Sequence, residues 1–184
     1  MGQRQGGRRS DCPLMQPIDA PASARDLELI ESQLGRPPRG VISVAHRCEC
    51  GAPSVVRTAP RFPDGTPFPT HFYLTCPRLT AEVSRLEEQG MMTELTSSLG
   101  TDSGLRDGYR RAHENYLAAR ECHGAVPEIS GISAGGMPDR VKCLHVLVAH
   151  SLAAGPGVNP VGDLAVARLP KRPRGLPCLS ATED

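Results

Sequence analysis

The chain has 184 residues, of which 39% are hydrophobic and only 3% aromatic, with no tryptophan. This length and composition suit one globular domain whose core is built from aliphatic side chains. The formal net charge of +1 excludes a general electrostatic attraction to nucleic acid or to a membrane surface. No run of 18 apolar residues is present, so we expect no transmembrane helix.

The two ends of the chain are predicted to be disordered. Residues 1–20 and 169–184 lack periodicity and are rich in proline, glycine and charge. The N-terminal segment has no apolar stretch of the kind that secretory signals contain, so we expect a cytoplasmic protein. Residues 21–168 then form a single predicted domain. Removing both tails should leave the unfolding temperature of this domain nearly unchanged.

The first predicted element is a helix within residues 23–36. Ser23 can cap its N-terminus, and Asp26, three residues later, completes a capping-box pattern. Apolar residues follow at helical spacing, and Gly35 is a typical helix end.

Three β-rich runs come next. Residues 41–44 predict a strand that leads toward a pair of cysteines. Residues 54–58 and 70–75 flank a proline-rich connection that contains an Asp-Gly pair. That pattern is typical of a β-hairpin with a long loop.

The rest of the chain is predicted to be mainly helical. The expected helices cover residues 80–89, 91–99, 103–121 and 139–153. In the third of these, Leu105, Tyr109, Ala112 and Tyr116 recur at the spacing of one buried helix face. The predicted fold class is α+β, with a small antiparallel sheet packed by four to five helices.

Three stretches carry a resemblance to a known family. They are CECGAP at 48–53, PDGTPFPTHFYLTCPRL at 63–79 and GGMPDRVKCLHVLVAHSLAAGPGVNPVGD at 135–163. Together they resemble the domain-of-unknown-function family numbered 501, which occurs mainly in actinobacteria, over about residues 25–168. The family has no assigned activity, so the resemblance implies a domain boundary and no mechanism. Three of the seven cysteines, Cys178 among them, fall outside these stretches.

Three cysteines flank the predicted hairpin. Cys48 and Cys50 precede its first strand, and Cys76 follows its second. Because a hairpin returns its two ends to the same place, the three thiols should lie together. Three thiolates and one more soft ligand, from Cys143 or His145, would complete a tetrahedral zinc site. The alternatives are buried reduced cysteines or a redox or disulfide role.

The segment from Gly135 to Pro160 holds the densest group of chemically versatile residues. On a helix over 139–153, one apolar face comprises Val141, Leu144, Val148 and Leu152, and we expect it to be more than nine-tenths buried. Asp139, Cys143, Leu147 and His150 form a second stripe. His145 borders the apolar face, where a backbone carbonyl could satisfy it.

The second stripe has a catalytic interpretation and a structural one. In the first, Cys143 is a nucleophile if its pKa is lowered, and His150 is a general base. Cys143 and His150 are two helical turns apart, too far for a direct hydrogen bond. In the second interpretation, the stripe is another packing face.

The glycines before this helix also have two interpretations. Gly135 and Gly136 could expose backbone N–H groups to an anionic ligand, with Arg140 and Lys142 adding charge-assisted bonds. Asp139 in the same place would repel an anion. The alternative is that the glycines only permit a tight turn.

The sequence therefore favours a cytoplasmic, metal-stabilised α+β module that binds a protein partner or a small anionic ligand. The alternative is a hydrolase or transferase that acts on a phosphorylated or acyl substrate around residues 135–150. Nucleic-acid binding is disfavoured by the near-zero charge and the few aromatic residues.

Overall fold

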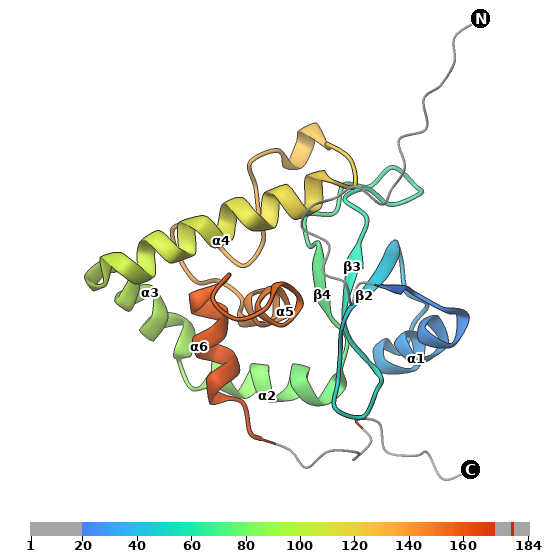
Figure 1. The fold of residues 1–184 in the computed structure, drawn as a ribbon, viewed down its shortest axis with the longest axis horizontal. Helices are drawn as coiled ribbons and strands as arrows, with labels where there is room; N and C mark the ends of the chain where they lie inside the picture. Colours follow the sequence, from blue (N-terminus) through green and yellow to red (C-terminus); the bar gives the residue numbers. More distant parts are fainter. Residues whose placement is uncertain (1–19, 172–177, 179–184) are drawn as a thin grey trace, which may run out of the picture.

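A small antiparallel sheet separates one helix, α1, from five others in the computed structural model (Figure 1). The structure describes residues 20–171 and residue 178. The α+β class is confirmed, with six α-helices instead of the expected four or five. The tails predicted to be disordered lie almost wholly outside the described residues.

The sheet has four strands in the order β1-β2-β3-β4, all antiparallel. Their bounds are Ala20–Pro21, Val41–Arg47, Pro53–Thr58 and Phe72–Leu74. The predicted hairpin is confirmed as β3 and β4, with Val55 opposite Leu74 and Arg57 opposite Phe72. Every residue of β3 is buried, because α1 covers one face of the sheet and α5 the other.

Helix α1, Ala24–Leu34, confirms the predicted capping pattern. The Ser23 hydroxyl accepts from the Asp26 backbone N–H at 3.1 Å, and the Asp26 carboxylate accepts from the Ser23 backbone N–H at 3.0 Å. Gly35 ends the helix in the left-handed conformation, with φ at 66°. Arg47 of β2 donates two further hydrogen bonds to the Asp26 carboxylate, at 2.8 and 3.1 Å, and so ties α1 to the sheet.

Replacing this carboxylate should weaken the fold in a pH-dependent way. The hydrogen bonds from Arg47, partly opposed by burial, hold the pKa of Asp26 well below its usual range. The ionised carboxylate therefore contributes stability above the unfolded pKa of about 3.9, and this contribution is lost as the pH falls below that value. We expect Asp26→Asn to cost about 2 kcal/mol at pH 7.

Urea unfolding of both chains at pH 7 and pH 3 measures this effect. The difference between wild type and Asp26→Asn should shrink at the lower pH. Glu28→Gln, which alters an exposed carboxylate on the same helix, is the matched control and should stay within about 0.5 kcal/mol at both pH values. A cost for Asp26→Asn that is the same at both pH values would contradict the prediction.

The remaining helices surround a central one. They are α2 Pro77–Glu88, α3 Met91–Thr101, α4 Ser103–Glu121, the 3-10 turn η1 Pro127–Ile129, α5 Leu144–Ala154 and α6 Pro160–Arg168. Figure 1 shows α5 nearly end-on, between β4, α2, α4 and α6. Helix α6 was not predicted. It begins at the Asn159 cap and Pro160, and Gly162 lets it approach α5 closely, since a Cβ there would lie 2.3 Å from the Leu147 carbonyl oxygen.

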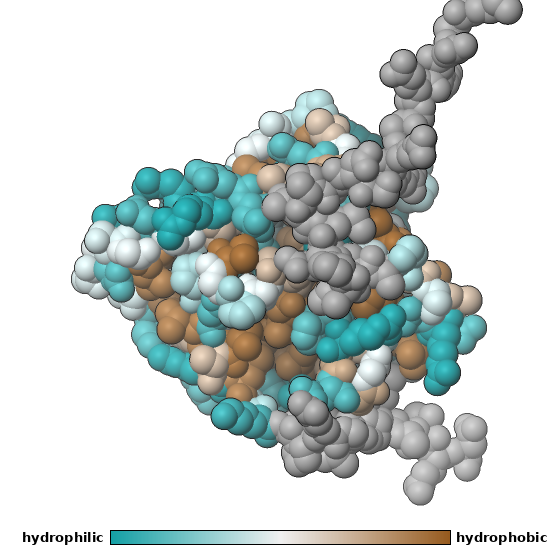
Figure 2. Space-filling model, in the orientation of Figure 1, coloured by the Kyte–Doolittle hydropathy of each residue, from teal (hydrophilic) through white to brown (hydrophobic). Residues whose placement is uncertain are grey.

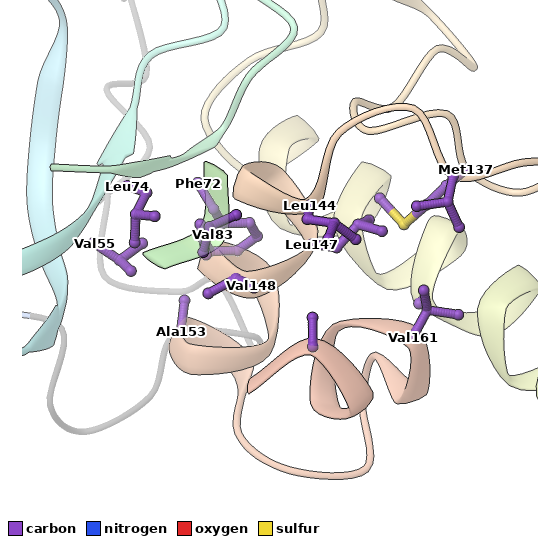
Figure 3. Packing of buried hydrophobic residues seen from close by; sticks show 14 of the residues in the cluster. Val55, Phe72, Leu74, Val83, Met137, Leu144, Leu147, Val148, Ala153 and Val161 are labelled. Atoms are coloured by element: carbon purple, nitrogen blue, oxygen red, sulfur yellow. The ribbon is translucent and has the colours of Figure 1, made fainter. Parts of the chain in front are cut away.

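The central position of α5 corrects two expectations. The helix begins at Leu144 instead of the expected Asp139. Residues 137–142 form turns and extended backbone. Leu152 is only partly buried, whereas Leu147 of the second stripe is fully buried together with Leu144 and Val148. Figure 3 shows Leu144, Leu147 and Val148 between β4 and the helical part of the core. A helix buried on nearly all sides does not show the one-sided pattern that the sequence analysis assumed.

The face of the molecule drawn in Figure 2 has an apolar region. Figure 2 shows hydrophobic residues gathered where α5 and α6 lie in Figure 1, and hydrophilic residues along α4. Leu164 of α6 is 44% exposed. Among the described residues, no helix combines the length and apolar character needed to cross a bilayer.

Candidate functional site

Three of the predicted metal ligands lie at one end of the sheet. Cys48 and Cys50 belong to a tight turn after β2, in which the Gly51 N–H donates to the Cys48 carbonyl at 2.8 Å and the Cys48 N–H donates to the Ala52 carbonyl at 2.9 Å. Cys76 is the N-cap of α2, directly after β4. Because β2 and β4 both pair antiparallel with β3, the turn at Cys48 and the start of α2 at Cys76 lie at the same end of the sheet.

Cys178 joins this group from the C-terminal part of the chain. Its Sγ lies 3.1 Å from Cys48 Sγ and 3.5 Å from Cys50 Sγ. Cys76 also interacts with Cys178 and contributes to raising the Cys178 pKa. We call these four residues the cysteine cluster. The sulfurs of Cys48, Cys50 and Cys178 all lie within 4.8 Å of one another and could hold a metal ion.

The spacing of these sulfurs fits shared metal ligands better than a disulfide. Zinc with sulfur ligands at about 2.3 Å separates tetrahedral sulfurs by about 3.8 Å. The observed 3.1 and 3.5 Å are slightly shorter than that distance and much longer than a disulfide bond of about 2.05 Å. All four cluster cysteines carry free thiols.

The surroundings of the cluster favour a thiolate at Cys48 and a protonated thiol at Cys178, whose pKa is raised by burial and by the neighbouring thiols. Burial opposes ionisation of Cys48, but hydrogen bonds from the Cys50 amide, the neighbouring thiols and Arg78 outweigh it and lower the Cys48 pKa to about 7. Arg78 also bonds to Cys178, and its own pKa is raised by these contacts, against its burial. A guanidinium beside thiolates balances part of the negative charge that a thiolate-rich metal site carries.

Cys143, predicted as the fourth metal ligand, belongs to a different group. Its Sγ lies 3.9 Å from His145 Nδ1, which in turn lies 3.2 Å from Glu87 Oε1. The structure brings Cys178 to the cluster in its place. Little in the sequence indicates this exchange, because Cys178 lies in a proline-broken segment without periodicity, where only its residue type points to a ligand.

His150, predicted as a general base, is fully buried in the core. Its Nε2 donates to the Asn115 side-chain oxygen at 2.9 Å, and its Nδ1 accepts from the Asn159 amide at 3.2 Å. Burial, followed by the charge of Arg57, lowers the His150 pKa to about 3. The ring is therefore neutral with both nitrogens occupied, and this corrects its assignment as a base for Cys143.

The predicted anion loop is a closed turn. The Lys142 N–H donates to the Gly135 carbonyl at 2.8 Å, and the Arg140 N–H donates to the Gly136 carbonyl at 3.1 Å. Gly136 has φ at 92°, and a Cβ there would lie 2.5 Å from the Arg140 carbonyl oxygen, so the turn itself requires glycine. The turn is separated from the start of α5, whose first N–H, that of Leu144, donates to Glu87 at 2.7 Å. The structure therefore separates the two parts of the predicted anion site.

Comparison with known proteins gives one result. A family model described as a protein of unknown function, DUF501, matches residues 44–167. No curated protein and no solved structure matches the chain. The match includes Cys48, Cys50, Cys76 and Cys143, whereas Cys178 lies beyond its end.

Proposed function

The chain belongs to the DUF501 family of proteins of unknown function, and on this premise we propose that it is an α+β module whose cysteine cluster holds one zinc ion. The observation that carries the proposal is the position of Cys178. This residue is 130 positions from Cys48 in the sequence, yet its sulfur lies 3.1 Å from the Cys48 sulfur.

The choice of zinc rests on the chemistry of the donors. Four cysteine sulfurs form a soft donor set that suits zinc in a closed, structural site. The ion would link the turn after β2, the start of α2 and the C-terminal segment. Such a link compensates for a core with few aromatic side chains, because the binding energy of a structural metal adds to the stability of the fold. The role of the module in binding a protein partner or a small anion stays a prediction.

Metal content of the purified full-length chain tests the proposal. We expect one zinc per chain by elemental analysis after growth in zinc-supplemented medium and dialysis against a weak chelator. Cys48→Ser and Cys178→Ser should each lose at least nine-tenths of this zinc, because each removes a thiolate ligand. Cys143→Ser is the matched control and should retain the zinc of the cluster, since Cys143 lies in a separate group.

Two outcomes would reject the zinc site. The first is a wild-type chain without metal whose cluster thiols all react with a thiol reagent after unfolding, which would indicate buried reduced cysteines. The second is a disulfide between Cys48 and Cys178, found by peptide mapping without reductant. Either result would leave the fold assignment intact, since the cysteines themselves contribute only part of the core.

A further inference from the structure

Cys143, His145 and Glu87 form a second group of reactive side chains, on facing ends of α5 and α2. Cys143 is the N-cap of α5, and its Sγ lies 3.9 Å from His145 Nδ1. Glu87 Oε1 lies 3.2 Å from the same nitrogen. All three side chains are partly exposed, unlike His150.

The hydrogen bonds of His145 determine which nitrogen can exchange a proton. Nε2 lies 3.2 Å from the Thr80 backbone carbonyl, which can only accept, and 3.4 Å from the Ser84 hydroxyl, which can also accept, so we assign the proton to Nε2. In the neutral ring, Nδ1 is then the unprotonated nitrogen, and it is the one that faces the Cys143 sulfur. Once protonated, Nδ1 can donate to the thiolate or to Glu87, so both anionic neighbours stabilise the imidazolium form.

The same contacts favour an ion pair between Cys143 and His145. Burial and the charge of Glu87 oppose ionisation of Cys143, but the His145 side chain and the backbone amides of Val146 and His145 outweigh them and lower the Cys143 pKa. The bond to Cys143 and the charge of Glu87 raise the His145 pKa to about 9, against the effect of burial. Tyr116 of α4 also interacts with Cys143, but burial raises its pKa to about 12, so it stays neutral at pH 7.

The pair opens into a pocket of about 220 Å³. Its lining joins the α5 end to β4 and two threonines, and comprises Thr70, Phe72, Tyr73, Leu74, Thr80, Cys143, His145 and Val146. The walls next to the sulfur are therefore mostly apolar. They suit a short hydrophobic group better than a phosphate, for which the lining residues provide no arginine or lysine.

We propose that Cys143 is a nucleophile for acyl transfer, with His145 as its acid–base partner, Glu87 as a positioning residue, and esters or thioesters of short apolar acids as substrates. A thiol and an imidazole that line one pocket, with a carboxylate in contact with the imidazole, form an arrangement that can activate a nucleophilic cysteine. This inference is independent of the zinc cluster and uses none of its residues.

The reaction balances without any further reagent except water. The Cys143 thiolate attacks the carbonyl carbon, and the tetrahedral intermediate expels the alcohol or thiol, which takes the proton from His145 Nδ1. The product is a thioester on Cys143. Water then gives a proton to Nδ1 and attacks this thioester. Collapse of the second intermediate releases the carboxylic acid and restores the thiolate and the protonated imidazole.

The first test measures the reactivity of the thiol. Alkylation of the folded full-length chain by iodoacetamide is followed by peptide mapping at Cys143 between pH 5 and 9. In wild type we expect the pH at which the alkylation rate is half-maximal to lie below about 8.5, the pKa of a free cysteine. His145→Gln should raise the midpoint and slow alkylation at pH 7 about tenfold. His113→Gln, a change in a histidine on α4 that bonds to Ser133, is the control and should leave the midpoint unchanged.

The second test measures acyl transfer with p-nitrophenyl butyrate. Wild type should release p-nitrophenolate and carry one butanoyl group on Cys143, and Cys143→Ala should lower the rate at least 100-fold. The proposal is overturned if wild-type Cys143 alkylates with the midpoint of a free cysteine, or if Cys143→Ala retains the activity. It is also overturned if micromolar zinc protects Cys143 from alkylation, since Glu87, Cys143 and His145 would then be metal ligands. If a variant fails to fold, the pH midpoint of wild-type alkylation still tests whether the pKa of Cys143 is lowered.

Discussion

Leu144→Ala should lower the free energy of unfolding by about 2–5 kcal/mol, the range for truncating a leucine in a well-packed core. Leu144 is fully buried in the first turn of α5, where it packs among residues of the sheet and the surrounding helices (Figure 3). Neighbours on several elements cannot all move inward, so most of the lost volume should remain as a cavity. Urea unfolding, followed by circular dichroism, measures the effect.

Leu152→Ala is the matched control for this prediction. It removes the same atoms from the same helix, but Leu152 is only partly buried. Its cost should therefore be less than half that of Leu144→Ala, because part of the leucine already contacts water. Equal costs at the two positions would contradict the view that Leu144 is more tightly packed than Leu152.

Arg120→Met should also be strongly destabilising, by about 3 kcal/mol or more. Arg120 is buried on α4, and its guanidinium donates to the backbone carbonyls of Ile132 at 2.6 Å, Ile129 at 2.7 Å and Pro69 at 3.3 Å. Methionine preserves much of the side-chain length but leaves these oxygens without their donor. Each buried carbonyl that loses its partner costs about 1–3 kcal/mol.

Arg110→Met on the same helix provides the comparison. Its side chain is 60% exposed, and its nearest acidic partner, Asp107, is 4.0 Å away at the surface. This change should alter stability by less than about 0.5 kcal/mol. Arg120→Lys should fall between the two, since one ammonium group cannot reach all three oxygens. A loss for Arg120→Met no greater than for Arg110→Met would show that water satisfies the carbonyls.

The elements that were predicted well carry local signals. Ser23, Asp26 and Gly35 define α1 through contacts within a few residues. On α4, Tyr109, Ala112 and Tyr116 are fully buried, as their spacing indicated, whereas Leu105 of the same predicted face is only partly buried. The hairpin of β3 and β4 follows from the alternation of β-forming runs and turn residues. In each case the short-range pattern and the tertiary contacts favour the same structure.

The errors concern residues whose environment is set by distant parts of the chain. The start of α5 could not be read from periodicity, because Val141 is buried without being helical. His150 has the same helical spacing whether it faces a cleft or Asn115 and Asn159, and only the tertiary fold distinguishes these cases. Cys178 and Glu87 enter their sites through contacts across 130 and 58 residues, respectively.

The place of α5 in the chain constrains how the protein is made. Synthesis proceeds from the N-terminus at about 5–20 residues per second, so the strands, α2 and α4 leave the ribosome before α5. Until residues 144–154 follow, the surfaces that will enclose this helix, including Phe72, Val83 and Tyr116, have no α5 to cover them. The nascent chain thus passes through a stage in which α5 does not yet cover these apolar side chains, and exposed apolar surface of this kind promotes aggregation. Ribosomes that stop within this interval would release products unable to bury their own core.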